Sequence, residues 1–225
     1  ITDITISIND SKTMAADAKN YVDQGFTQLK VKAGLNPEQD EEAIQAIFDK
    51  IGDAAVLKID ANQGWSPKKT IQVMNRFSGS RLEIVEQPLP AWQTNANSLI
   101  RGEISQGLML DESVHSSHDA FKVLQNESAD VINIKLMKSS GIFDAEAINR
   151  LAEAAGIPCM IGCMAESRLG IAAAVHFAAA HENVKYCDLD SFMMLDEQGW
   201  LTGGFTRKGE MLTLTEEPGL GIHLK

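Results

Sequence analysis

Short apolar runs rich in β-branched residues alternate with longer stretches of helical periodicity along most of the chain. This alternation is typical of βα units arranged around a parallel sheet. We expect eight strands, at residues 4–8, 28–32, 55–60, 82–86, 108–111, 131–135, 158–161 and 185–189. Evenly repeated units without a Gly-x-Gly-x-x-Gly fingerprint favour an α/β fold closed into a (β/α)8-type barrel over a doubly wound open sheet.

Helices are expected between these strands, at residues 11–24, 37–50, 67–77, 96–105, 118–126, 141–155 and 168–180. Asn36 followed by Pro37 is a typical helix start, because the asparagine side chain can cap the first turn and proline fits the first helical position. Helices should end at the glycines that precede the next strand, at Gly25, Gly52 and Gly156.

The size of the chain suits a single domain. With 225 residues, of which 44% are hydrophobic, the chain can bury one sizeable core. No low-complexity linker divides it, so we expect residues 1–202 to form one barrel domain with catalytic function. Residues 203–225 contain several glycines and short alternating stretches, and we expect this tail to run outside the barrel.

Charge and hydropathy exclude several classes of partner. A net charge of -11 argues against nucleic-acid binding, which requires a basic stripe on the surface. No uncharged apolar run approaches the ~20 residues that span a bilayer, and residues 1–10 lack the pattern of a signal peptide. We therefore expect a cytoplasmic protein without a membrane partner. The chain begins with Ile1 and not with methionine, so we expect an upstream segment to be missing.

The three cysteines, Cys159, Cys163 and Cys187, lie in apolar surroundings. An odd number of cysteines in such a context suits buried thiols better than a disulfide framework. Cys159 and Cys163 form a Cys-x3-Cys pair, which alone is weak evidence for a metal, because no further cysteine or histidine cluster completes a tetrahedral zinc site.

Charged residues end five consecutive predicted strands. Lys32, Asp60, Glu86, Asp111 and Lys135 follow one another at intervals of 24 to 28 residues, which is one βα unit each. Active sites of such barrels lie at the C-terminal ends of the strands, and neighbouring strands are ~4.8 Å apart. The three acids should therefore reach one ion, and oxygen-only ligands favour a single Mg²⁺. The alternative is that each acid only caps the helix that follows.

Lys32 and Lys135 flank the acids on opposite sides, an arrangement that suits proton transfer by two bases. A general base needs a pKa lowered from ~10.4 towards 7 or 8, which burial or a neighbouring cation can supply. Lys30 points to the same face of its strand as Lys32, so their repulsion should lower the pKa of at least one of them. A solvated lysine pair is the alternative.

Asp188 and Asp190 flank Leu189 in the last predicted strand, so both acids should point into the barrel. Two buried carboxylates are costly unless a cation accompanies them. The ammonium group of a ligand is the natural partner, and a helix cap or a salt bridge to a barrel lysine is the alternative.

These motifs together resemble the enolase superfamily, specifically its muconate lactonizing enzyme subgroup, and are closest to the dipeptide epimerases of the L-Ala-D/L-Glu epimerase kind. The resemblance covers essentially the whole chain. The segments that carry it are Lys30-Val31-Lys32, Asp60-Ala61-Asn62-Gln63-Gly64-Trp65, Val85-Glu86-Gln87-Pro88, Asp111-Glu112-Ser113, Asn133-Ile134-Lys135 and Asp188-Leu189-Asp190.

The resemblance implies a modified (β/α)7β barrel whose N-terminal capping domain is absent from this chain and towards which residues 203–225 would pack. It implies a Mg²⁺-dependent epimerase that inverts the α-carbon of a dipeptide's C-terminal residue through a metal-stabilised enediolate. Lys32 and Lys135 would be the two bases, and Lys30 would tune Lys32. Asp188 and Asp190 would bind the amino group of the dipeptide. Cell-wall peptide recycling and homo-oligomers are further expectations from the resemblance.

Other residues receive supporting roles. Asn62, Gln87 and Glu112, which neighbour the metal acids in sequence, should surround the site without binding the metal. Met164 and Glu166, in the segment after the seventh strand, are candidate contacts of the substrate side chain. An N-acyl amino acid racemase, an o-succinylbenzoate synthase or cycloisomerase, and a non-catalytic barrel remain alternatives, and the sequence leaves the preferred dipeptide open.

Overall fold

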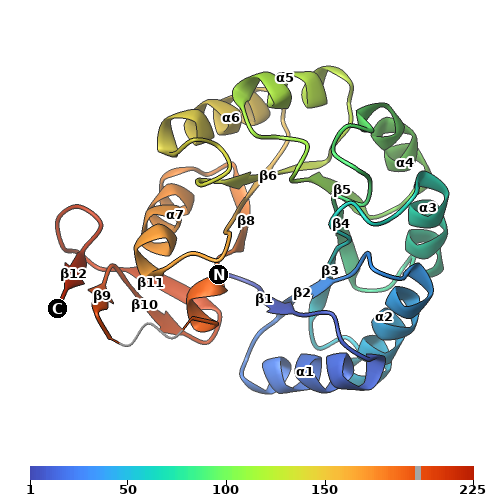
Figure 1. The fold of residues 1–225 in the computed structure, drawn as a ribbon, viewed down its shortest axis with the longest axis horizontal. Coiled ribbons are helices and arrows are strands. Elements are labelled where there is room, and N and C mark those ends of the chain that lie inside the picture. The colour runs from blue at the N-terminus through green and yellow to red at the C-terminus, as the bar shows by residue number, and fades with distance from the viewer. Residues whose placement is uncertain (196–198) are drawn as a thin grey trace.

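The computed structural model describes residues 1–195 and 199–225, and its main feature is a parallel sheet curved into a ring (Figure 1). The strands occur in chain order around the ring, so each strand pairs with the next. All eight predicted strands are confirmed within one or two residues at each end. They are β1 (Ile4–Ile6), β2 (Gln28–Lys32), β3 (Val56–Asp60), β4 (Leu82–Glu86), β5 (Gly107–Leu110), β6 (Val131–Lys135), β7 (Cys159–Gly162) and β8 (Val184–Asp188).

In the described residues, seven α-helices cover the outside of the ring (Figure 1). They are α1 (Ser11–Asp23), α2 (Pro37–Ile51), α3 (Pro67–Arg76), α4 (Asn97–Glu103), α5 (Ser117–Gln125), α6 (Ile142–Ala154) and α7 (Arg168–Ala180). The 3₁₀ turn η1 (Thr94–Ala96) precedes α4, which is shorter than predicted. In the described part of the chain β8 leads into the 3₁₀ turn η2 (Ser191–Met193) and not into an eighth helix, so the expected (β/α)7β architecture is confirmed.

The predicted capping signals act as expected at α2. The Asn36 side chain accepts hydrogen bonds from the backbone N–H groups of Glu38 and Gln39, at 3.1 and 3.3 Å, and Pro37 occupies the first turn. At the other end Gly52 has a φ of 55°, a conformation that glycine adopts without strain. The helix is therefore delimited by residues that could be read from the sequence.

Apolar residues fill the space between sheet and helices, whereas the interior of the ring is mixed. Below the strand ends, Ile84, Met109, Val131 and Met160 form a small apolar cluster, with Tyr186 packed against them. Towards the C-terminal ends, the inward positions carry buried lysines, aspartates and a glutamate instead. The barrel thus ends in a charged mouth, where sites of this fold lie.

The ring closes between β1 and β8 without a regular ladder of backbone hydrogen bonds. Three contacts close this seam, from Asp3 N to Cys187 O at 3.0 Å, from Leu189 N to Thr2 Oγ1 at 2.8 Å and from Thr5 N to Asp190 Oδ2 at 2.7 Å. Two of them use side chains as acceptors. Asp190 therefore contributes to closure of the barrel as well as to its mouth.

The tail after the barrel forms two small antiparallel pairs beside α7 (Figure 1). The strand β9 (Leu201–Gly203) pairs with β12 (Ile222–Leu224), and β10 (Phe205–Lys208) pairs with β11 (Met211–Leu214). Glu210, in the β10–β11 turn, accepts hydrogen bonds from Thr27 N through its carboxylate at 2.7 Å and from Thr2 N through its carbonyl at 2.8 Å. The turn thus supports the N-terminal side of the barrel, and contact of the tail with a capping domain stays a prediction.

None of the described helices is long and apolar enough to cross a bilayer. The three cysteines are free thiols, as predicted.

Candidate active site

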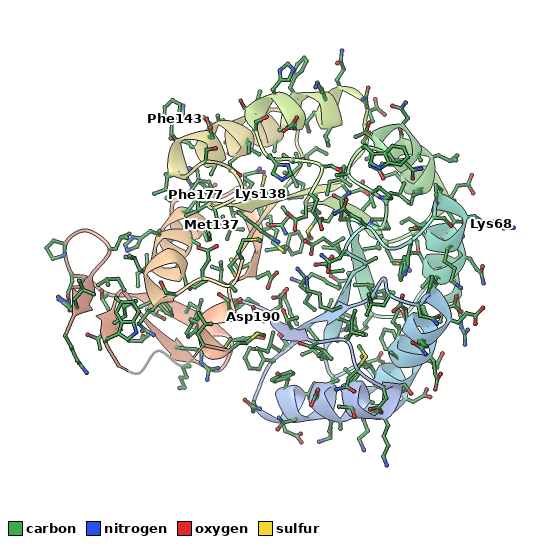
Figure 2. All side chains as sticks on the ribbon, viewed as in Figure 1. Lys68, Met137, Lys138, Phe143, Phe177 and Asp190 are labelled. Atoms are coloured by element: carbon green, nitrogen blue, oxygen red, sulfur yellow. The ribbon has the colours of Figure 1, made fainter. Side chains whose placement is uncertain are left out.

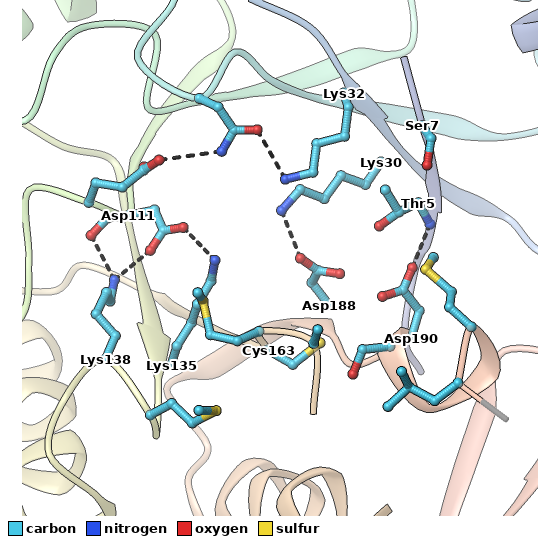
Figure 3. Close-up of a pocket in the computed structure, with 18 of the residues that line it drawn as sticks. Thr5, Ser7, Lys30, Lys32, Asp111, Lys135, Lys138, Cys163, Asp188 and Asp190 are labelled. Carbon is cyan, nitrogen blue, oxygen red and sulfur yellow. Dashed lines mark hydrogen bonds and ion pairs between the residues drawn. The ribbon is translucent and has the colours of Figure 1, made fainter. Parts of the chain in front are cut away.

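A cavity of about 810 Å³ opens at the C-terminal ends of the strands. Figure 2 places Lys138 and Asp190 inside the ring of strands, whereas Lys68 and Phe143 project outward from the helices. Basic and acidic side chains face each other across the cavity (Figure 3). The charged residues that line it include Lys30, Lys32, Lys135, Lys138, Asp111, Glu112, Asp188 and Asp190.

Lys30 is buried at the centre of the acids. Its Nζ lies 3.0 Å from Asp60 Oδ2, 2.9 Å from Glu86 Oε2 and 2.7 Å from Asp188 Oδ2. Burial alone would lower the pKa of Lys30, but these carboxylates, Asp188 foremost, hold that pKa well above its usual value. Repulsion by Lys32 therefore does not lower the pKa of Lys30, because three anions outweigh one cation.

Lys32 reaches further into the cavity. Its Nζ donates to Asp60 Oδ2 at 2.7 Å and to Asn62 Oδ1 at 3.1 Å. Asn62 in turn donates to Glu112 Oε1 at 3.3 Å. The side chain of Lys32 remains 30% exposed, so it can meet a ligand while the acid and the amide orient its ammonium group. The structure thus places the predicted supporting residues Asn62 and Glu112 beside Lys32.

Asp111 is held between two lysines. Lys135 Nζ lies 2.6 Å from Asp111 Oδ2, and Lys138 Nζ lies 2.6 Å from Oδ1. Burial would raise the pKa of Asp111, but Lys138 and Lys135 hold it well below its usual range. The backbone N–H groups of Asp111 and Ser113 donate to Gln87 Oε1 at 3.0 and 3.2 Å. Gln87, a predicted supporting residue, therefore fixes the start of this loop.

Lys135 enters the cavity from β6, on the side opposite Lys32 on β2 (Figure 3). Burial would lower the pKa of Lys135, but the Asp111 carboxylate outweighs burial and raises this pKa. Paired with this acid, Lys135 keeps its proton, and the lowered pKa that a general base needs stays a prediction.

Lys138 was not singled out from the sequence. It is the third residue after Lys135, in the segment that leaves the sixth strand. The signal that could have revealed it is the position itself, because charged residues in this part of a barrel unit gather at the mouth. The sequence alone does not show that its side chain turns back to Asp111.

Asp188 and Asp190 both point into the barrel, as predicted, but their surroundings differ. Lys30 neutralises Asp188, which confirms the alternative of a salt bridge to a barrel lysine. Burial would raise the pKa of Asp188, yet Lys30 lowers it to about 2. Asp190 accepts the backbone N–H of Thr5, and burial together with the charge of Asp188 raises its pKa to about 6. Asp190 is thus the acid whose charge calls for a further cation.

Asp60, Glu86 and Asp111 offer only oxygen atoms, the donors that Mg²⁺ selects. Asp60 and Glu86 share the ammonium group of Lys30, whereas Asp111 binds other lysines. The register explains the difference, because Glu86 pairs with Met109, two residues before Asp111. Among the described residues, these three acids do not form a group whose oxygens all lie within 4.8 Å of one another, so they are more widely spread than expected. Lys32 and Lys135 bind Asp60 and Asp111, so the donor set fits a hard dication that takes over these two contacts while Lys30 stays in place.

Cys163, Asp188 and Asp190 are the described residues that bring three potential ligand atoms within 4.8 Å of one another. Burial raises the pKa of the Cys163 thiol to about 12, so it keeps its proton at neutral pH. A metal requires the thiolate. With Lys30 already on Asp188, this group suits an ammonium group better than a metal ion.

The two candidate substrate contacts after β7 have different surroundings. Met164 lines the cavity and is half exposed. Glu166 is not among the lining residues, and its Oε1 accepts the backbone N–H of Met164 at 3.0 Å. The backbone of Glu166 is also tied to the Ser191 hydroxyl. The structure thus gives Glu166 a contact within the loop in place of a cavity contact.

A (β/α)7β barrel with lysines from β2 and β6 on either side of strand-end acids defines a class of barrel, the enolase type. Comparison with known proteins agrees with this class. Residues 13–225 match the family model described as enolase C-terminal domain-like, and the chain belongs to this family of the enolase superfamily.

Several relatives are dipeptide epimerases. The L-Ala-D/L-Glu epimerase of Bacillus subtilis is 44% identical over 98% of this chain and 61% of its own length. Its substrate-liganded structure superimposes with a TM-score of 0.95 and covers 98% of this chain and 62% of that one. The Enterococcus faecalis dipeptide epimerase, complexed with Mg and L-Leu-L-Tyr, has 40% identity and a TM-score of 0.95, with coverage of 99% and 63%.

Another relative is a racemase, the N-succinyl-L-Arg/Lys racemase of Bacillus cereus. It is 31% identical over 97% of this chain and 59% of its own length. The chain thus spans about three fifths of the length of the relatives it matches.

Proposed function

We propose that the protein to which this chain belongs is a Mg²⁺-dependent epimerase of dipeptides, with residues 1–202 as its catalytic barrel. The observation that carries the proposal is the pair of lysines, Lys32 and Lys135, on opposite sides of one cavity that Asp190 also lines. Two bases on opposite faces of a planar intermediate can invert a carbon centre, whereas one base can only exchange its proton.

Lys32 and Lys135 would alternate in the reaction. One neutral lysine removes the α-proton of the C-terminal residue, and the protonated lysine across the cavity delivers a proton to the opposite face. The roles reverse for the other epimer. Asn62 and Asp60 orient Lys32, and Asp111 orients Lys135, so each ammonium group has a fixed approach.

Asp60, Glu86 and Asp111 are the residues that would hold Mg²⁺. When bound, this ion would supply positive charge for the substrate carboxylate and would compensate the acid that otherwise raises the pKa of Lys135. Lys30 stays charged between Asp60, Glu86 and Asp188 and holds these acids together. Its proposed role is thus positioning through Asp60.

The acid at the far end of the cavity favours dipeptides over N-acyl amino acids. Asp190 lines the cavity and lacks the lysine partner that Asp188 has. It offers an anion to the free ammonium group of a dipeptide. A succinylated amino acid carries a carboxylate instead, which this end would repel. The same argument disfavours the succinate-bearing substrate of an o-succinylbenzoate synthase.

The test is incubation of full-length protein and Mg²⁺ with a panel of dipeptides in D₂O, including L-Ala-L-Glu. Mass spectrometry and chiral chromatography should find epimers that carry deuterium at the C-terminal α-carbon. The panel should include N-succinyl amino acids as the matched alternative. Exchange of N-succinyl substrates without exchange of any dipeptide would favour the racemase, and no exchange at all would refute both.

A further inference from the structure

Lys138 is held by all three of its ammonium protons. Its Nζ donates to Asp111 Oδ1 at 2.6 Å, to the Asp111 carbonyl at 2.6 Å and to the Asn133 carbonyl at 2.8 Å. The side chain is 8% exposed. The amine therefore connects β6 to the loop after β5. It fixes both the backbone and the side chain of Asp111.

The two sides of the cavity share one feature, a carboxylate that both a proposed base and a second, buried lysine contact. On one side Lys32 and the buried Lys30 share the carboxylate of Asp60, at 2.7 and 3.0 Å. On the other side Lys135 and the buried Lys138 share the carboxylate of Asp111, at 2.6 Å each. In each pair the proposed base binds an acid whose position a second lysine determines.

We infer that Lys138 is a positioning residue, which holds Asp111 by Oδ1 so that Oδ2 is presented to Lys135 and to the metal site. This inference rests on the proposed function. Burial lowers the pKa of Lys138 although Asp111 opposes the change, which raises the question whether Lys138 is itself a base. Its three hydrogen bonds answer it, because an amine that donates three times has no lone pair to offer a substrate.

A purely electrostatic role would give the opposite effect on metal binding. A cation beside a metal-binding carboxylate weakens the attraction for Mg²⁺, so removal of the Lys138 charge should by itself strengthen binding. Removal of the contact that orients the ligand should weaken binding, as loss of outer partners does at other metal sites. The sign of the change in Mg²⁺ affinity therefore separates the two roles.

The experiment compares wild type, Lys138→Met and Lys138→Gln by calorimetric titration with Mg²⁺. We expect both variants to bind Mg²⁺ about tenfold more weakly. Unchanged or tighter binding by folded variants would overturn the inference. Circular dichroism and thermal unfolding establish which variants are folded, and the glutamine variant keeps one donor near Asp111 if the methionine variant fails to fold.

A second measurement addresses Lys135. The exchange of α-hydrogen in D₂O is followed separately for the two C-terminal epimers of one dipeptide at saturating Mg²⁺. Lys138→Met should slow the direction that requires Lys135 at least several-fold more than the direction that requires Lys32, with Lys135→Met and Lys32→Met defining these directions. Equal slowing of both would assign Lys138 a general structural role and overturn the inference.

The matched control is the double variant Asp3→Asn, Lys58→Met, which removes a buried lysine together with its acid at 2.5 Å, outside the cavity lining. It should keep the Mg²⁺ affinity and the ratio of the two exchange rates of wild type. A change in this control equal to that in Lys138→Met would also overturn the inference. Failure of the wild type to bind Mg²⁺ or to exchange either epimer would instead refute the proposed function.

Discussion

Charge compensation at single residues decides which lysines of the cavity can act as bases. Lys30 has three acid partners and Lys138 has three acceptors, so both are fixed as ammonium groups. Lys32 and Lys135 each pair with a single carboxylate. When this carboxylate binds another cation instead, Lys32 or Lys135 can lose its proton and act as a base. Lys30 and Lys138 keep their other partners and stay protonated.

The raised pKa of Asp190 predicts that substrate affinity depends on pH. Because its pKa is raised to about 6, its carboxyl group gains a proton as the pH falls through 6 and loses the charge that attracts an ammonium group. We expect the KM for a dipeptide to rise about tenfold per pH unit well below pH 6, as measured by initial rates between pH 8 and 5.

The control for this prediction is Asp190→Asn, which should have a raised KM at pH 8 that changes little towards pH 5. Asparagine keeps an acceptor for the Thr5 backbone, so the seam between β1 and β8 should persist. A KM of the wild type that stays constant across this range would contradict the role assigned to Asp190.

The limits of sequence-based prediction are clearest at this scale. Lys32, Asp60, Glu86, Asp111 and Lys135 could be predicted because strand period and unit length place strand ends at the mouth. Their partners could not, because a lysine has a long side chain with many rotamers that reach several acids. The contacts of Lys30 with Asp188 and of Lys138 with Asp111 join segments whose distance only the closed ring determines.

Helix α2 holds the two loops that follow β2 and β3. Asp40 on α2 accepts the backbone N–H of Gly34 and the Nε1–H of Trp65, both at 2.9 Å. These partners lie in the loops after β2 and β3, which approach closely, since a Cβ on Gly64 would meet Gly34 O at 2.0 Å. The loop that carries Asn62 is therefore positioned by a helix outside the barrel.

Replacement Asp40→Ala should destabilise the protein by about 2 to 4 kcal/mol, because two hydrogen bonds to a buried carboxylate are lost. Urea unfolding followed by circular dichroism measures this loss. Asp49→Ala, an exposed acid of the same helix, is the control and should change the free energy of unfolding by less than about 0.5 kcal/mol. Equal effects of the two changes would show that Asp40 does not link the loops.

Strand and helix positions could be predicted closely because each element carries its own period and end signals, as Asn36 and Gly52 do for α2. The helix α4 is shorter than the predicted 96–105, since it begins after a 3₁₀ turn at Thr94–Ala96 and ends at Glu103, where Ile104 is extended. The seam between β1 and β8 could not be predicted from the sequence either, because side-chain acceptors replace the backbone hydrogen bonds of a regular strand pair there.

The whole barrel depends on charges that are compensated inside the ring. Asp3 and Lys58 form an ion pair of 2.5 Å with nearly complete burial of both side chains. Burial raises the pKa of Asp3 although Lys58 opposes the shift, so the pair tolerates the loss of one partner poorly. The free energy of unfolding should therefore depend on keeping Asp3 and Lys58 paired.

Lys58→Met alone should cost about 3 to 5 kcal/mol, because it leaves an uncompensated buried carboxylate. Asp3→Asn, Lys58→Met should recover most of this loss, as both charges are then removed. Urea unfolding of wild type, both single variants and the double variant gives the coupling energy between the two residues. Additive effects would contradict the ion pair.

Separate exchange measurements on Lys32→Met and Lys135→Met test most directly whether two bases act from opposite sides of one cavity. Both variants should lose epimerisation of a reactive dipeptide by about 10²-fold or more. Each should still exchange the α-hydrogen for deuterium in one C-terminal epimer, and the two variants should do so in opposite epimers. Loss of exchange in the same epimer for both variants, or epimerisation that survives either change, would contradict the account.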